Sequence, residues 1–441
     1  MEGVCRAWRL GSLASYAATR TLTTEDWRWP AGWDHRIVST EAFYWAVKRL
    51  GPYVTGLRLD DRQIARGLRP QVVAIAVRSC PLLTRVDLTG ARVRPAALRD
   101  LASAALALTE LRVGQSFGSV ESELSALLAP ASRLAVFVAS TTEFAGVALM
   151  RISPGLRELR LKSCEGVLSA PVGAALAALT CLSAVELTQC RSLTSEEPLR
   201  ALVENESLHV TLRELIITDV DFSPLPDEEQ EGEIEAPRML DPQFIELQIG
   251  PAETARTVAE VFTELRTLTT MFCGWVANAF VINIGSHLVR LTELDLSGCS
   301  NIRGQFALEP LSTLPELIRL TINNLHPSVG GQVLGIIASL EEIRARDSQG
   351  INDEDVSGAA TGCLRLRILD VEGCLAVTDR TLHGATEIVR RQGRTALLRL
   401  SVGGTSAGCW TTVRPSLVLH IIRDRVYAPI LHWLITSRRV A

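Results

Sequence analysis

Long apolar runs are missing from this chain of 441 residues. No run reaches the roughly 18 residues that a membrane helix needs, and the first residues lack the uninterrupted apolar core of a secretory signal. The formal net charge is only -4, which gives no electrostatic reason to bind nucleic acid or an acidic membrane surface. We therefore expect neither a nucleic acid nor a membrane as a partner.

Several patterns that mark redox, metal and catalytic sites are also missing. None of the ten cysteines forms a Cys-x-x-Cys pair or lies near a histidine at a zinc-ligand spacing. A disulfide framework is not expected at this size, which predicts reduced thiols and a cytoplasmic protein. There is no GxGxxG after a strand, no GxxxxGK[ST] and no HExxH. The sequence thus predicts no enzyme, no cofactor and no metal site.

A frame of the form Leu-x-x-Leu-x-Leu-x-x-Cys recurs along most of the chain. Its clearest copies are LRELRLKSC from Leu156, LSAVELTQC from Leu182, LTELDLSGC from Leu291 and LRILDVEGC from Leu366. Allowing other apolar residues, frames begin at Val54, Leu83, Leu108, Leu134, Leu156, Leu182, Leu212, Phe244, Leu265, Leu291, Leu317, Leu340, Leu366 and Leu397. The period of about 26 residues resembles that of leucine-rich repeats and not that of purely helical repeats.

Each frame predicts a short strand whose alternating apolar residues, such as Leu159 and Leu161, point into the core. The apolar stretches from Pro171 and Thr378 predict helices of two or three turns that return the chain to the next parallel strand. The expected fold is therefore an α/β leucine-rich-repeat solenoid, a horseshoe with parallel strands on its concave face and helices on its convex face. Five cysteines fall at the ninth frame position, where we expect a small buried side chain against the backbone of the turn.

Three segments follow from this pattern. Residues 1–53 hold five of the eight tryptophans and predict a cap over the first repeat. Residues 54–410 form a solenoid of about 14 repeats, with an acidic loop at 221–238. Residues 411–441, apolar with scattered arginines, predict a second cap.

The start of the chain resembles a known family. Val4-Cys5-Arg6-Ala7-Trp8 is similar to the end of an F-box, and F-box/leucine-rich-repeat proteins continue with a Trp-containing linker into cysteine-containing repeats of about 26 residues. The resemblance implies a substrate-recognition component of an SCF-type cullin ubiquitin ligase. The rest of the F-box is missing from this chain, so a Skp-type adaptor and cullin are expected partners only if it lies upstream.

Two alternatives stay open. The chain fits a non-catalytic scaffold subunit of a large assembly, such as a ciliary axoneme or a mitochondrial complex. Arg6, Arg9 and Arg20, interleaved with apolar, Ser and Thr residues, also fit a mitochondrial presequence. Nuclear, mitochondrial and ciliary locations therefore stand beside the cytoplasmic one.

The concave face is the predicted binding surface for a protein partner. Fourteen strands at about 4.8 Å give on the order of 65 Å of surface, which suits an extended protein. Residues at the third, fifth and seventh frame positions face this surface, and their charges alternate in blocks that can set a partner's register. Ile216, Met271 and Ile368 are candidate apolar anchors. The alternative is a solvated strand face with no partner. The candidate contact residues are Glu158, Arg160, Lys162, Ile216, Met271, Glu293, Asp295, Arg319, Asn323, Glu342, Arg344, Arg346, Ile368, Asp370, Glu372 and Arg399.

Overall fold

The computed structural model describes residues 20–23, 44, 47–60, 70–220, 222, 252–392, 398–406 and 417–420. The chain divides into two compact units, the first comprising Met1–Leu212 with Asp219–Asp227 and the second comprising Arg213–Thr218 with Glu228–Ala441. The Val4–Trp8 stretch, most of the acidic loop and residues 421–441 lie outside the described residues.

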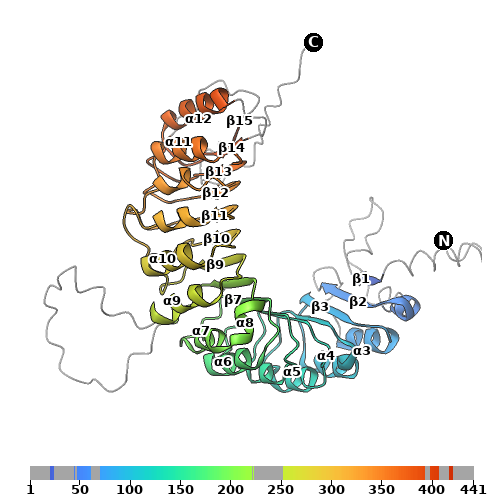
Figure 1. The fold of residues 1–441 in the computed structure, drawn as a ribbon. Helices are drawn as coiled ribbons and strands as arrows, with labels where there is room; N and C mark the ends of the chain where they lie inside the picture. The colour runs from blue at the N-terminus through green and yellow to red at the C-terminus, as the bar shows by residue number, and fades with distance from the viewer. Residues whose placement is uncertain are drawn as a thin grey trace, which may run out of the picture. The chain divides into compact units, whose positions relative to one another are not determined.

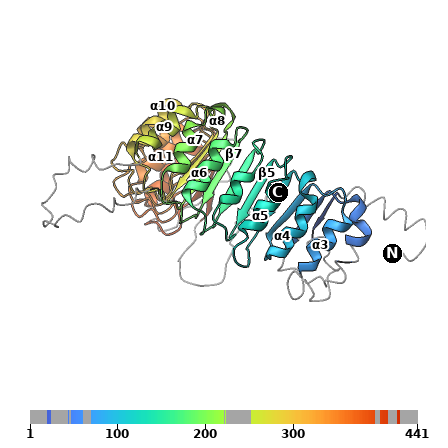
Figure 2. The same cartoon turned by 90° about the horizontal axis from the view of Figure 1, so that it is seen from below.

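Strands in both units pair in parallel with their neighbours in chain order (Figures 1 and 2). In the first unit they are β1 Thr21–Thr23, β2 Gly56–Asp60, β3 Arg85–Gly90, β4 Glu110–Val113, β5 Val136–Ser140, β6 Glu158–Lys162 and β7 Ala184–Thr188. In the second unit they are β8 Glu214–Thr218, β9 Thr267–Met271, β10 Glu293–Asp295, β11 Arg319–Thr321, β12 Glu342–Arg344, β13 Ile368–Asp370, β14 Leu398–Ser401 and β15 Leu417–His420.

Helices connect the strands and cover one side of them within each unit (Figure 1). The first unit has η2 Gly51–Tyr53, α3 Pro70–Ser79, α4 Pro95–Leu101, η4 Ala102–Ala107, α5 Glu121–Leu128, η5 Val147–Arg151, α6 Ser169–Ala178, α7 Glu197–Glu204 and α8 Glu206–Thr211. The second has α9 Ala252–Val261, α10 Asn278–His287, η7 Glu309–Thr313, η8 Gln332–Gly335, α11 Asp353–Gly362 and α12 Asp379–Gln392. The helices predicted from Pro171 and Thr378 are confirmed as α6 and α12.

The core of each unit lies between its strands and its helices. In β6 the residues alternate, with Leu159 and Leu161 fully buried and their neighbours half-exposed. The same alternation runs through β8 and β9. The side of the strands turned away from the helices, formed by the third, fifth and seventh frame positions, is called the strand face below. The predicted α/β leucine-rich-repeat solenoid is confirmed by this parallel strand order and repeating burial.

The eighth frame position has a left-handed backbone in ten successive described repeats. Seven of these residues are not glycine: Thr141, Ser163, Gln189, Asp219, Phe272, Asn324 and Asp347. The other three are Gly298, Gly373 and Gly404. A left-handed residue at this point turns the chain out of the strand, at a cost that is small for glycine and larger for threonine or phenylalanine.

In several repeats the ninth position holds a buried side chain that donates to the preceding repeat. The Cys164 thiol donates to the Ala139 carbonyl oxygen at 3.4 Å, and the Cys374 thiol donates to the Ala345 carbonyl oxygen at 2.8 Å. The Ser348 hydroxyl does the same to Ile322 at 2.6 Å. Burial raises the pKa of Cys299 to about 11 and that of Cys374 to about 12. The described cysteines are free and all but Cys181 are buried, and buried thiols are unreactive. The expected packing role is confirmed.

Three features differ from the sequence pattern. The frame from Phe244 lies outside the described residues, and β8 pairs directly with β9, with Glu214 in register with Thr267. Strands β1 and β15 lie in the segments predicted to be caps. The connections before β11 and β12 are the short 3₁₀ helices η7 and η8 and not α-helices of two or three turns. The boundaries 1–53, 54–410 and 411–441 stay predictions.

Candidate functional site

The candidate contact residues fall on two separate parts of the strand face. Glu158, Arg160 and Lys162 lie on β6 in the first unit, and all the others belong to the second unit. In β6 the three side chains are half-exposed because the strand turns alternate residues away from the core. Along the strand, every second residue faces away from the core, as the sequence pattern predicted. Contact between these residues and a partner stays a prediction.

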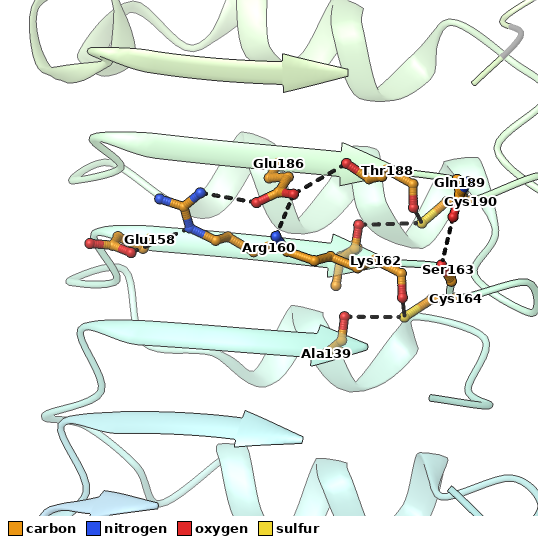
Figure 3. A network of polar contacts seen from close by, with 11 residues as sticks. Ala139, Glu158, Arg160, Lys162, Ser163, Cys164, Glu186, Thr188, Gln189 and Cys190 are labelled. Carbon is orange, nitrogen blue, oxygen red and sulfur yellow. Dashed lines mark hydrogen bonds and ion pairs between the residues drawn. The ribbon is translucent and has the colours of Figure 1, made fainter. Parts of the chain in front are cut away.

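The candidate residues of β6 are bound together by an acid on the next strand (Figure 3). The Glu186 carboxylate accepts from Arg160 Nη1 at 2.9 Å and pairs with Lys162 Nζ at 2.6 Å. Thr188 Oγ1 donates to the same carboxylate at 3.3 Å, and Arg160 Nε lies 3.5 Å from Glu158. Burial acts to raise the pKa of the Glu186 carboxyl, but the hydrogen bonds and charges of Lys162 and Arg160 outweigh it and lower that pKa.

Glu186 is a residue that the sequence reasoning missed. It occupies the fifth position of the frame from Leu182, directly across from Arg160 in the strand register. Its side chain is only 8% exposed. The signal was available, because the fifth position of each frame faces away from the core and a lone acid beside two cations predicts an ion pair.

Charges on β10 to β13 also pair with one another. Arg319 bonds to Glu293 across adjacent strands, and Arg344 Nε lies 2.5 Å from Glu342 two residues earlier. Arg346 Nη2 lies 2.6 Å from Asp370 and 3.7 Å from Glu372. The alternating blocks of charge seen in the sequence therefore neutralise each other within the molecule.

The other polar candidates are tied to the backbone. Asp295 Oδ1 accepts from the Ser297 N–H at 2.9 Å, and burial raises the pKa of the Asp295 carboxyl. Asn323 Oδ1 accepts from the Arg346 N–H at 2.8 Å. These bonds fix the side chains on the strand face without pairing them with a cation.

Apolar candidates are only partly covered. Ile216, Met271 and Ile368 are half-exposed on β8, β9 and β13. In the frame from Leu134, Val136 is half-exposed but Val138 is 2% exposed. The strand pairing Phe137↔Leu159 fixes the register of that frame. Val138 lies on the strand face in register with Arg160 but is covered there, so it is not an exposed contact residue.

A Gly-x-Ser-x-Gly sequence, which in hydrolases places a nucleophilic serine on a strand-to-helix turn, runs from Gly404 to Gly408. The Ser406 hydroxyl donates to the Leu375 carbonyl oxygen of the preceding repeat at 2.6 Å, so it serves the turn that follows β14. Within the described ranges no cluster of three or more His, Cys, Asp or Glu side chains is arranged to hold a metal ion. No helix among the described residues is long and apolar enough to cross a membrane.

No protein-family model and no curated protein matches this chain. Among solved structures, an internalin of Listeria monocytogenes is 12% identical over 88% of this chain and 94% of its own, with a TM-score of 0.46. Rad7 in the yeast Rad7–Elc1 complex is 14% identical over 86% and 92%, with a TM-score of 0.44. A leucine-rich-repeat protein of Leptospira interrogans is 11% identical over 84% and 95%, with a TM-score of 0.41. The repeat period, the parallel register and the recurring left-handed turn themselves define the described chain as a leucine-rich-repeat solenoid.

Proposed function

We propose that this chain binds a protein partner through the strand face of its repeats. The observation that carries the proposal is a face of half-exposed side chains held in fixed positions by ion pairs, such as the Glu186 network of β6 and β7. In the second unit, β8 to β14 at about 4.8 Å per strand span about 30 Å. A surface of this length fits a protein better than a metabolite.

Rigid placement supports recognition. A side chain already held in one conformation loses little entropy when a partner docks. Half-exposed Ile216, Met271 and Ile368 add apolar area among the charges, and apolar anchors within a polar surround are typical of interaction surfaces.

The finer proposal is that the bound protein is a substrate of a cullin-type ubiquitin ligase. Its support is the Val4–Trp8 resemblance to an F-box and the cysteine-containing repeat period. The alternative is a scaffold subunit of a large assembly, which uses the same strand face for permanent partners. The two proposals differ in one respect, the presence of a Skp-type adaptor and cullin among the partners.

Affinity capture of the tagged chain from the cells that produce it tests both the binding of a protein by the strand face and the choice between ligase and scaffold. Thr269→Arg on β9 and Thr321→Arg on β11 change half-exposed strand-face residues, whereas Ile282→Arg changes an exposed residue of α10 on the helix side. We expect the two strand-face variants to lose the partner and Ile282→Arg to keep it. The reverse pattern would refute binding by the strand face. Recovery of adaptor and cullin with the parent chain supports the ligase; their absence beside a stable partner supports the scaffold.

A further inference from the structure

Asp295 is an acid of the strand face without a counter-ion. It lies on β10 in register with Thr269 of β9 and Thr321 of β11, two half-exposed side chains that carry no charge. Its Oδ1 accepts from the Ser297 N–H at 2.9 Å. None of the described residues forms an ion pair with it, and burial raises the pKa of its carboxyl. The fold therefore leaves a half-exposed carboxylate whose charge is not compensated.

The cations on neighbouring strands are engaged by other acids. Among the strand-face positions of β8 to β11, all of which are described, Arg319 is the only cation, and it bonds to Glu293. Arg344 on β12 lies two strands from Asp295, and its Nε lies 2.5 Å from Glu342. The acids at the strand-face positions of β8 to β11 are Glu214, Glu293 and Asp295. Three acids and one arginine give this part of the strand face a net charge of -2.

Three further arginines lie in the turns before these strands and not on the strand face. Arg213 and Arg290 both pair with Glu264, at 3.6 Å and 2.6 Å. Arg266 lies three residues before Thr269, about 10 Å along the strand. The turn arginines therefore do not supply the counter-ion of Asp295.

An exposed aromatic ring borders the same part of the strand face. Phe272, at the eighth position after β9, has φ +53° and is 51% exposed. Its ring lies against Gly298, where a Cβ would overlap it, so the ring reaches across the end of β10. A phenylalanine in a left-handed backbone is strained, and strained residues cluster at active and ligand sites. Half-exposed Met271 precedes Phe272 and enlarges the apolar surface.

We infer that the strand face of β9 to β11 binds an extended segment of a protein partner in which a lysine or arginine is followed closely by an apolar residue. The cation pairs with Asp295, and the apolar side chain packs against Phe272 and Met271. The fifth and eighth repeat positions are about 10 Å apart along a strand, which matches side chains about three residues apart in an extended segment. This inference rests on the proposed function and names the chemistry of the partner.

A docked cation relieves an unfavourable charge. A partly buried acid that is ionised without a counter-ion destabilises the fold, and an ammonium or guanidinium group of the partner supplies the missing charge-assisted hydrogen bonds. The threonines on either side are short and leave the carboxylate accessible. Thr269→Arg and Thr321→Arg would each place a cation beside Asp295 within the chain, in competition with the partner.

Fluorescence anisotropy with the full-length chain provides the test. The probe is a fluorescein-labelled peptide of three Lys-Ser-Ser-Leu repeats, compared with peptides that carry glutamate for lysine or serine for leucine. We expect the lysine–leucine peptide to bind most tightly. Asp295→Asn should weaken its binding about tenfold, a loss of about 1.4 kcal/mol, and Phe272→Asn should abolish the preference for leucine over serine. The matched control Glu309→Gln removes an exposed acid from η7 and should leave binding unchanged.

Neither variant is expected to weaken the fold. Asp295→Asn removes a charge that burial disfavours. Asn324 already occupies the eighth position two repeats after Phe272, with φ +52°, and asparagine adopts this backbone more readily than phenylalanine. Thermal unfolding of both variants checks their stability. The comparison of the three peptides on the parent chain keeps the test valid if a variant unfolds.

Other outcomes overturn the inference. Equal or tighter binding of the glutamate peptide, no binding of the lysine–leucine peptide by the parent chain, or equal losses in Glu309→Gln and Asp295→Asn would each do so. If the natural partner is lost with Thr269→Arg but kept in full by Asp295→Asn and Phe272→Asn, this inference fails and the proposed function stands. If no strand-face variant affects the partner, both fail.

Discussion

In several repeats the ninth position holds a buried thiol or hydroxyl that donates to a carbonyl oxygen of the preceding repeat. Cys164, Cys299 and Cys374 do this with sulfur, and Ser348 does it with oxygen. The shared feature is a small donor and not cysteine chemistry. The sequence predicted that the ninth-position side chains are buried. It could not identify the carbonyl oxygen that accepts each bond, because that depends on the register between repeats.

We expect Cys374→Ala to lower the free energy of unfolding by about 1–2 kcal/mol, because a buried acceptor loses its donor and a small cavity forms. Cys374→Ser should lose less, since Ser348 occupies the same position one repeat earlier. Urea denaturation of the two variants measures the difference. Equal destabilisation by Ala and Ser would contradict the role of the donor.

Gly298 at the eighth position has φ +70°, and a Cβ there would overlap the ring of Phe272. We expect Gly298→Ala to cost about 1–3 kcal/mol from backbone strain together with this clash. The Phe272→Ala/Gly298→Ala variant should recover the steric part of the loss in thermal unfolding. No recovery would mean that strain alone sets the cost.

Two acids on the strand face should respond to pH in opposite ways. The pKa of Glu186 is lowered in the fold, so its stabilising contribution is present above the ordinary value of 4.5 and is lost as pH falls through the folded value. The pKa of Asp295 is raised by burial, so its ionised form destabilises the fold above the folded value, and this penalty is absent below the ordinary 3.8.

We therefore expect Glu186→Gln to lower stability at pH 7 by about 2 kcal/mol, and Asp295→Asn to raise it. Both differences should vanish in acid. Denaturation measured across pH checks the signs. Stabilisation by Glu186→Gln at neutral pH would show that its ion pairs do not offset its burial.

At the scale of elements, the period of the frames predicted the strands and the paired helices. It missed β1, because Thr21–Thr23 offers only Leu22 as an inward residue, and β15, because an apolar run does not separate a strand from a helix. The frame from Phe244 lies outside the described residues, and β8 pairs directly with β9. The alternation of β6 located the strand face, but the pairing of Arg346 with Asp370 depends on interstrand register and side-chain conformation, which the pattern does not contain.

Helix α11 begins with a capping box. The Asn352 side chain accepts from the Glu354 and Asp355 N–H groups, and the Asp355 carboxylate accepts from the Asn352 N–H at 3.1 Å. We expect Asn352→Ala to cost about 1 kcal/mol, whereas Asn352→Ser, which keeps a capping oxygen, should cost less. Thermal unfolding compares the two, and an unchanged Tm for both would show that α11 is held by packing alone.

At the scale of the molecule, each repeat buries its core against its neighbours, and the strand face lies on the side of the strands away from that core. Most charges of that face are internally paired, and in the ion pairs of the second unit the arginines are the more exposed partners. The exposed side chains of such a face determine which partner it can bind. The repeat scaffold holds these side chains in fixed positions.

Site-specific photo-crosslinking tests the central claim most directly. A photoreactive amino acid is placed at Thr321 on the strand face of β11 or at Ile282 on α10, and the full-length chain is irradiated in the cells that produce it. Binding by the strand face predicts a discrete crosslinked protein from Thr321 and none from Ile282. The same protein crosslinked from Ile282 and not from Thr321 would contradict the account.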